Sequence, residues 1–269
     1  MSGARFDYEA KIWGAPEVRL SPSCIQGLKL RYCLEDLSGL GGRVLDVGCG
    51  GGNMAKAIKR YRPDLQVWGV DLSERALAAA AIHPNGTHFL AAAGERLPFA
   101  GGFFHAVAMF DVLEHIPEPE AALAEIRRVL HPGGLFHLFL PLEKQPYTFY
   151  AVMHRLGWKA KEKHCGHVHA FSEPESRALL ESHGFQVKAL RWSFHPFFSL
   201  VDIAYFSLLS LLGKNVPTSV EGHIYGGRPT IRRRLLAVLN AVLVSMGYLE
   251  SRLLRRFPGG GGHFSLQKM

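Results

Sequence analysis

The hydrophobic pattern of the first 140 residues alternates between short apolar runs and longer segments of helical period. Apolar runs predict five strands, at residues 43–47, 66–70, 87–91, 106–110 and 135–140. Apolar positions three or four residues apart predict helices between them, at about 23–37, 54–61, 73–82 and 119–130. Strands that alternate with helices of roughly 10–15 residues favour a parallel sheet covered on both faces. Ligands of such sheets bind beyond the carboxyl ends of the strands, so the loops after Val47, Val70 and Phe110 should share one rim.

The pattern changes after residue 140. A helix capped by Ser172 is predicted at 173–183, and an alternating sixth strand at 185–192. An apolar and basic stretch follows, and the last hexamer, 263–268, alternates again. We interpret this hexamer as a seventh strand that returns to the sheet. The predicted fold is therefore α/β, with a seven-stranded sheet and a helical hydrophobic insertion between strands six and seven.

Composition and charge exclude several classes of protein. Of the 269 residues, 48% are hydrophobic and 20% are charged, which is too apolar for a disordered chain. The net charge is +8, yet residues 191–269 hold 10 Lys/Arg against three Asp/Glu, so this most apolar part carries +7. Such a distribution argues against a nucleic-acid partner and favours a membrane surface or an anionic amphiphile. Four cysteines without a CxxC pair, and no signal-peptide layout, predict a cytoplasmic protein with reduced thiols.

The strongest chemical signal is the glycine-rich turn after the first strand, VLDVGCGGGN at 44–53. Glycines there let a ligand approach the backbone, and the following helix presents free N–H groups. Asp71, about 25 residues on at the tip of the next strand, is placed to accept both hydroxyls of a ribose. The alternative is an ordinary tight turn. The turn matches neither a phosphate-binding P-loop nor the plain dinucleotide motif, and Asp46 would repel a pyrophosphate but suits an ammonium group.

These motifs resemble the class I S-adenosylmethionine-dependent methyltransferases, particularly the subgroup with the ubiquinone-pathway O-methyltransferase and many lipid and natural-product enzymes. The resemblance covers about residues 40–192 and the final strand. It is carried by VLDVGCGGG at 44–52, GVDLS at 69–73, GERLPF at 94–99, FDVLEHIPEP at 110–119, LHPGGLF at 130–136 and HVHAFSEPESRALLESHGF at 167–185. The resemblance implies a Rossmann-like fold with S-adenosylmethionine as its cofactor.

The resemblance also implies which residues bind that cofactor. Those implied at its methionine end are Asp46, Gly48, Cys49 and Gly50, with Tyr8 of an N-terminal lid. Those implied elsewhere are Asp71 on the ribose, Leu72 on the adenine, Gly94 and Glu95 at the adenine edge, and Phe110, Asp111 and Val112 beneath the sulfonium. Ala93 departs from the family, which commonly has an Asp there, so a backbone contact or Glu95 is expected to replace it. The aromatic segment around Tyr8 could instead pack on the surface.

His115 and His167 are the candidate catalytic residues. Such enzymes act mainly by alignment, and a base is needed only for a hydroxyl or a protonated amine. Both histidines have structural alternatives as loop-stabilising residues. Two sets of residues could bind a metal. The resemblance implies Asp111, Glu114 and His115, and His167 and His169 would share one face of an extended segment. We expect no metal.

The insertion holds two apolar segments, 197–213 and 235–249, and arginines bracket the second: Arg232, Arg233, Arg234, Arg252, Arg255 and Arg256. Helices of this kind suit a peripheral position on an anionic membrane, such as the inner face of the cell membrane; the alternative is a substrate cap or a homodimer interface. The expected units are a lid and helix at 1–40, the cofactor domain at 41–194 plus 259–269, and the insertion at 195–258.

The predicted function is methyl transfer to a hydrophobic or lipid-like acceptor, at an oxygen atom in preference to nitrogen or carbon. One alternative is methylation of a soluble aromatic natural product, with the insertion as lid or dimer contact. Another is a non-catalytic, membrane-associated module that binds the cofactor.

Overall fold

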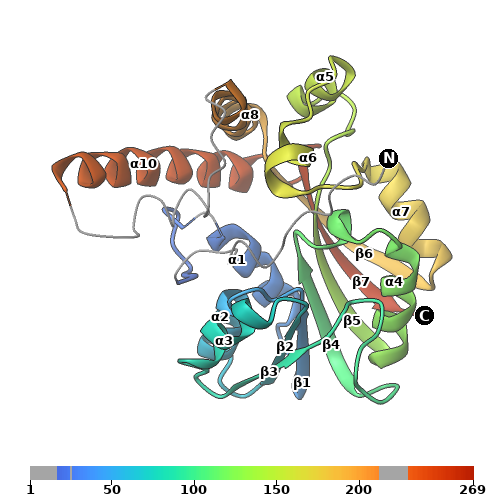
Figure 1. The fold of residues 1–269 in the computed structure, drawn as a ribbon. Coiled ribbons are helices and arrows are strands. Elements are labelled where there is room, and N and C mark those ends of the chain that lie inside the picture. The colour runs from blue at the N-terminus through green and yellow to red at the C-terminus, as the bar shows by residue number, and fades with distance from the viewer. Residues whose placement is uncertain (1–16, 25, 212–229) are drawn as a thin grey trace.

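A computed structural model describes residues 17–24, 26–211 and 230–269 (Figure 1). Its centre is a seven-stranded sheet in the order β3-β2-β1-β4-β5-β7-β6. The strands are β1 (Arg43–Val47), β2 (Gln66–Asp71), β3 (Thr87–Ala91), β4 (Phe104–Phe110), β5 (Leu130–Pro141), β6 (Phe185–Ser193) and β7 (Gly261–Lys268). Strands β1 to β5 pair in parallel, whereas β7 lies antiparallel between β5 and β6. The predicted α/β fold, with the last strand inserted in the sheet, is confirmed.

Helices cover both faces of this sheet. They are α1 (Gly27–Asp36), α2 (Asn53–Tyr61), α3 (Glu74–Ala81), α4 (Pro119–Val129) and α7 (Glu173–Ser182), with a short 3-10 turn η1 (Leu113–His115). Ser73 caps α3 by accepting a hydrogen bond from the Ala76 amide at 3.0 Å, and Ser172 forms a capping box with Glu175. The first helix begins four residues later than predicted, because residues 19–24 form backbone turns that end at the Gly27 amide.

Two differences from the predicted elements lie around β5. This strand begins at Leu130 instead of residue 135, because a register shift against β4 accommodates the segment around Gly133, which has φ of 72°. Beyond β5, two short helices that the pattern did not predict, α5 (Phe149–Arg155) and α6 (Ala160–Cys165), lead toward α7. Both are too short to show a clear helical period.

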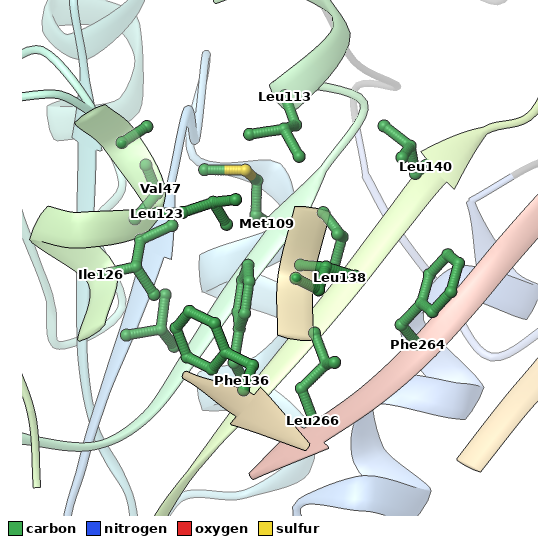
Figure 2. Packing of buried hydrophobic residues seen from close by; sticks show 14 of the residues in the cluster. Val47, Met109, Leu113, Leu123, Ile126, Phe136, Leu138, Leu140, Phe264 and Leu266 are labelled. Atoms are coloured by element: carbon green, nitrogen blue, oxygen red, sulfur yellow. The ribbon is translucent and has the colours of Figure 1, made fainter. Parts of the chain in front are cut away.

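The two faces of the sheet have separate hydrophobic cores. On β1, Leu45 and Val47 belong to one cluster and Val44 to the other, because alternate side chains point to opposite faces. Figure 2 shows the first cluster, where side chains of α4 such as Ile126 lie beside Phe136 of β5. Burial on both faces explains why the strands read as continuous apolar runs.

The insertion consists, in its described part, of α8 (Pro196–Leu211) and α10 (Ile231–Leu253). The start of α8 packs closely against the last part of α10. A Cβ added at Gly247 of α10 would lie 2.1 Å from a ring carbon of Phe198 in α8. The Glu250 carboxylate accepts hydrogen bonds from the Phe197 and Phe198 amides, at 2.9 and 3.2 Å, and so caps α8. The other half of α10 projects from the body (Figure 1), and none of residues 231–243 is buried.

The first testable prediction concerns β7. Phe264 is fully buried between β5 and β6, so Phe264→Ala should lower the free energy of unfolding by about 3–5 kcal/mol, as other large-to-small core changes do. The matched control is Phe257→Ala, because Phe257 is 62% exposed; it should change stability by less than about 0.5 kcal/mol. Denaturant unfolding measures both. Equal effects of the two changes would contradict the placement of β7 in the core.

Candidate active site

The glycine turn lies where β1 meets α2, at the carboxyl edge of the sheet. The Gly48 and Cys49 amides donate to the Val70 carbonyl at 2.8 and 2.9 Å, which joins the turn to the end of β2. Gly48 has φ of 72°, and a Cβ there would lie 2.3 Å from a methyl carbon of Val112. Only glycine fits both the backbone angle and this contact. The turn is therefore held against the loop that follows β4.

Asp71 ends β2 beside this turn. One carboxylate oxygen accepts from the Gly50 amide at 2.7 Å, and the other accepts from the Ser73 amide at 2.9 Å. A carboxylate oxygen can accept more than one hydrogen bond, so both remain able to accept from a ligand. The neighbouring Leu72 is 64% exposed. The structure thus brings together a fixed carboxylate with free acceptor capacity and an exposed apolar side chain, as the predicted contacts with ribose and adenine require.

Asp46 lies beneath the turn on β1 and is 1% exposed. Its Oδ2 atom has no hydrogen-bond partner among the described residues. Burial, with a smaller contribution from the Asp71 charge, raises the pKa of Asp46 to about 8. An unpartnered carboxyl oxygen at this depth fits a ligand that brings a cation or a donor.

The remaining residues predicted at the cofactor lie along the same edge. A Cβ at Gly94 would lie 3.3 Å from Ile116 and 3.5 Å from Val47, so the loop with Glu95 packs against the end of β1. Phe110 ends β4, and Asp111 follows with φ of 53°. The Asp111 carboxylate pairs with Lys29 of α1, whose ammonium also lies 4.0 Å above the Phe139 ring centroid. Tyr8 lies outside the described residues.

The two candidate histidines come together beside Glu114. Their rings make an edge contact with centroids 4.9 Å apart, and each Nε2 atom lies 3.9 Å from Glu114 Oε1. His115 Nδ1 lies 3.1 Å from the Gly166 carbonyl, and His167 Nδ1 lies 2.8 Å from Glu143 Oε1. The Val168 amide also donates to the Glu114 carbonyl, so backbone contacts fix the loop against η1.

The electrostatics of this cluster differ between its members. Burial, reinforced by the nearby His167, lowers the pKa of His115 to about 4, so this imidazole is neutral at pH 7. Burial and the Asp111 charge hold the pKa of Glu114 well above its usual range, and neither carboxyl oxygen has a hydrogen-bond partner among the described residues. Burial alone would raise the pKa of Glu143, but the His167 hydrogen bond and the Lys161 charge lower it. The cluster therefore combines one carboxyl group whose pKa is raised with another whose pKa is lowered.

One ligand atom each from Glu114, His115 and His167 lie within 4.8 Å of one another, a spacing that one small cation or one acceptor hydroxyl could fill. This group contains Glu114 and His115 of one metal set considered from the sequence and His167 of the other, but neither Asp111 nor His169. His169 directs Nε2 at the Pro117 carbonyl, 3.2 Å away, and Asp111 is paired with Lys29.

Sequence reasoning missed Glu143 and Lys161. Glu143 follows β5 by two residues, so the rule that ligands bind beyond strand ends, applied to β5 as well, would have indicated it. Lys161 lies in α6, where nothing in the pattern marks it.

Comparison with known proteins agrees with this geometry. Residues 45–138 match the family model described as a methyltransferase domain. The chain is 31% identical over 175 residues to the ubiquinone biosynthesis O-methyltransferase of Idiomarina loihiensis, covering 60% of this chain and 70% of that protein. It is 34% identical over 153 residues to the enzyme of that name from Alkalilimnicola ehrlichii, and this match covers 54% of this chain and 61% of that protein. The matches thus span about three fifths of the length of several such relatives.

Solved structures show the same fold. An S-adenosylmethionine-dependent methyltransferase from Mesorhizobium loti has a TM-score of 0.55 at 18% identity, covering 91% of this chain and 98% of that one. The Haemonchus contortus phosphoethanolamine N-methyltransferase 2, in complex with S-adenosyl-L-methionine, has a TM-score of 0.57 at 17% identity. The match covers 89% of this chain and 52% of that one. The chain belongs to the class I S-adenosylmethionine-dependent methyltransferases. S-adenosylmethionine is the cofactor of this family, and the glycine turn, Asp71 and the unpartnered Oδ2 atom of Asp46 fit it.

Asp71 gives a direct test of cofactor binding. Asp71→Asn should weaken S-adenosylhomocysteine binding by at least about 1.5–3 kcal/mol, or roughly 10- to 100-fold, because hydrogen bonds to a charged acceptor are lost. Calorimetric titration measures the affinity, with Asp64→Asn as a control at an exposed carboxylate. An unchanged affinity in Asp71→Asn would contradict the assigned role.

Asp46 should make the stability of the cofactor-free protein depend on pH. Its pKa is about 8 when folded and about 3.9 when unfolded, so the folded state favours the protonated form. Protonation of Asp46 therefore stabilises the folded state. This stabilisation is fully present below about pH 4 and is lost as the pH rises through about 8. Asp46→Asn stays neutral, so its melting temperature relative to wild type should increase between pH 5 and pH 8.5. A constant difference across that range would contradict the raised pKa.

Proposed function

We propose that this protein methylates a hydroxyl oxygen of a hydrophobic, lipid-like small molecule at an anionic membrane surface. The observation that carries the proposal is the position of His167, paired with Glu143, at the same sheet edge as the glycine turn and Asp71. The relatives named above are O-methyltransferases of ubiquinone biosynthesis, which supports oxygen as the methylated atom.

In this proposal the residues of the chain bind the cofactor and the acceptor and align them. When bound, S-adenosylmethionine supplies an electrophilic methyl group on a sulfonium. Asp71 would hold the ribose and Asp46 the ammonium group, and Gly48 lets the turn pack against Val112 so that both carboxyl groups lie at one edge. Fixing both reactants in line accounts for most of the rate enhancement expected of such a site.

His167 is the better base of the two histidines. A hydroxyl acceptor loses its proton as the new carbon–oxygen bond forms, and an imidazole nitrogen can take that proton. The contact between His167 Nδ1 and the ionised Glu143 stabilises the resulting imidazolium. His115 Nδ1 lies 3.1 Å from an uncharged backbone carbonyl, and the lowered pKa of His115 makes it a weak base.

A small cavity of about 30 Å³ between α1, α8 and α10 has mainly apolar walls, which favours an apolar group on the acceptor. Leu28, Phe194, Phe198 and Val244 contribute apolar walls, and Lys29, paired with Asp111, also lines it. His263 at the wall is fully buried, and its Nδ1 atom has no hydrogen-bond partner among the described residues. Burial holds the pKa of His263 well below its usual value, so the ring is neutral and suits a hydroxyl or carbonyl group on an apolar ligand.

The exposed surface of α10 supports the membrane part of the proposal. Its exposed apolar side chains are Ile231, Leu235, Leu236, Val238, Leu239, Val242, Met246, Leu249 and Leu253. By length and composition this helix could also cross a membrane, although only 17% of its apolar window is buried. Arginines flank it at both ends, and their charge complements anionic headgroups. We therefore place α10 in the plane of the membrane surface.

The base assignment predicts a difference between histidine variants. His167→Gln should lower turnover by about 100-fold or more, while S-adenosylhomocysteine affinity stays unchanged. His115→Gln should have a smaller effect, and His169→Gln is the control in the same loop. The assay follows transfer of a labelled methyl group into a cell lipid extract. Normal turnover of His167→Gln would leave alignment alone as the mechanism.

The membrane assignment predicts salt-dependent flotation with vesicles of phosphatidylglycerol. Changing Arg232, Arg233 and Arg234 to Ser should weaken partitioning by roughly 100-fold, since each arginine near the surface contributes about 1 kcal/mol. Arg75, Arg96 and Lys188, which are exposed elsewhere, changed to Ser together form the control. Equal flotation with phosphatidylcholine vesicles would contradict the assignment. A concentration-dependent doubling of mass in sedimentation, lost when Leu235 and Val242 become Ser, would assign the face to a homodimer instead.

A further inference from the structure

The two nitrogen atoms of His167 have different surroundings. Nδ1 lies 2.8 Å from Glu143 Oε1, and Nε2 lies 3.9 Å from Glu114 Oε1, beyond hydrogen-bond distance. An ionised carboxylate can only accept hydrogen bonds, so Nδ1 carries the proton in the neutral ring. Nε2 then keeps its lone pair on the side that faces His115 and Glu114. The contact with Glu143 therefore selects one of the two tautomers of His167.

Glu143 is itself held by Lys161 of α6. The Lys161 ammonium lies 3.9 Å from Glu143 Oε1, and the side chains are only 11% and 12% exposed. A buried carboxylate needs a counter-charge to stay ionised, and Lys161 together with His167 supplies it. Glu143 thus has one partner on each side: the imidazole that it orients and the ammonium group that stabilises its charge.

Lys161 is in turn fixed by residues of α5 and of the insertion. Its ammonium lies 3.2 Å from Asp202 Oδ2 of α8 and 4.5 Å from the ring centroid of Tyr150. The Tyr150 hydroxyl donates to the same Asp202 oxygen at 2.5 Å. Burial opposes the charge of Lys161, but Asp202, Tyr150 and Glu143 together hold its pKa well above the usual range. A chain of buried contacts therefore runs from α8 through α6 to the imidazole.

The charges of this chain suit proton uptake. Lys161, Glu143 and Asp202 carry one positive and two negative charges, so the group has a net charge of −1 while His167 is neutral. A proton that arrives at Nε2 brings the buried group to neutrality. Because the interaction between charges is strong at low dielectric, these fixed groups favour the imidazolium at the moment it forms.

We propose that Glu143 is a positioning residue for His167, and that Lys161 and Asp202 hold Glu143 so that helix α8 of the insertion helps to set the tautomer of the base. This inference rests on the proposed function in one respect, that His167 accepts the proton of the acceptor hydroxyl. It adds a structural role to the insertion: α8 is connected to the catalytic base as well as to the apolar cavity. Phe194, just before α8, lies at this junction, because it lines the cavity and its ring centroid is 5.8 Å from Lys161 Nζ.

The tautomer can be observed without turnover. In the full-length protein labelled with ¹⁵N-histidine, the His167 signals are assigned by their loss in His167→Gln. Wild type should show a protonated Nδ1 and an unprotonated Nε2. Glu143→Leu removes the hydrogen-bond acceptor at similar size, so the protonated-Nδ1 population should fall, whereas Glu143→Gln, which keeps an acceptor, should give an intermediate result. Asp202→Asn should shift the signals in the same direction by less. Glu162→Gln, an exposed carboxylate on the same helix, is the control.

Turnover then separates this proposal from the proposed function. Glu143→Leu should lower kcat by at least about tenfold with little change in the KM for S-adenosylmethionine, and Glu143→Asp should restore part of it. A wild-type tautomer in Glu143→Leu would overturn the positioning role. A changed tautomer with normal kcat would instead uphold positioning and refute His167 as the base. S-adenosylhomocysteine binding and thermal melting check the fold; if Glu143→Leu does not fold, the tautomer shifts of Glu143→Gln and Asp202→Asn decide, and their absence overturns the proposal.

Discussion

The constraint that organises this protein is the burial of carboxyl groups at one edge of an apolar sheet. Asp46 is the next-to-last residue of β1, and Asp71 is the last residue of β2. Glu114 lies in the segment after β4, and Glu143 in the segment after β5. A buried carboxylate is costly unless hydrogen bonds or an opposite charge compensate it. Asp46 and Glu114 are buried and Asp71 and Glu143 are partly buried, and the loops that meet at this edge surround the four groups differently.

The partners divide the four groups into two kinds. Asp71 accepts hydrogen bonds from backbone amides, and Glu143 contacts His167 and Lys161, so both carboxyl groups are held in place. Asp46 and Glu114 have carboxyl oxygens without hydrogen-bond partners among the described residues, and burial raises the pKa of both. The fixed pair holds the loops of the site in place, and the pair with unpartnered oxygens lies where we propose that the ligands bind. The two positions suit the two ends of a methyl transfer, with Asp46 beneath the glycine turn and Glu114 beside the histidines.

Much of the fold followed from the sequence, because its signals are local. Doubly covered strands read as apolar runs, and glycine turns and serine caps mark where helices begin, so the place of β7 could be inferred from six alternating residues. The cofactor edge was equally accessible: the rule that ligands bind beyond parallel strands brought Asp46, Asp71 and Phe110 together. His115 and His167 were selected separately, and only the fold shows that their rings touch.

The rest depended on contacts between residues distant in the chain. Lys161 and Asp202 are 41 positions apart, and Lys29 reaches Asp111 across 82 positions, so no spacing rule connects either pair. The short helices α5 and α6 that bring Lys161 to the edge are stabilised by packing more than by their own period. Sequence reasoning therefore found which groups could react but not which groups orient them.

The most direct test of this account compares two ligands that differ only at the end assigned to Asp46. S-adenosylhomocysteine carries the amino acid moiety, and 5′-methylthioadenosine keeps the nucleoside but lacks that moiety. Calorimetric titration of wild type, Asp46→Asn and Asp71→Asn with both ligands measures six affinities. Asp46→Asn should weaken the binding of S-adenosylhomocysteine but leave the binding of 5′-methylthioadenosine unchanged. Asp71→Asn should weaken the binding of both ligands by the same factor. Equal losses for both ligands in Asp46→Asn would contradict the division of the edge into a nucleoside end and an ammonium end.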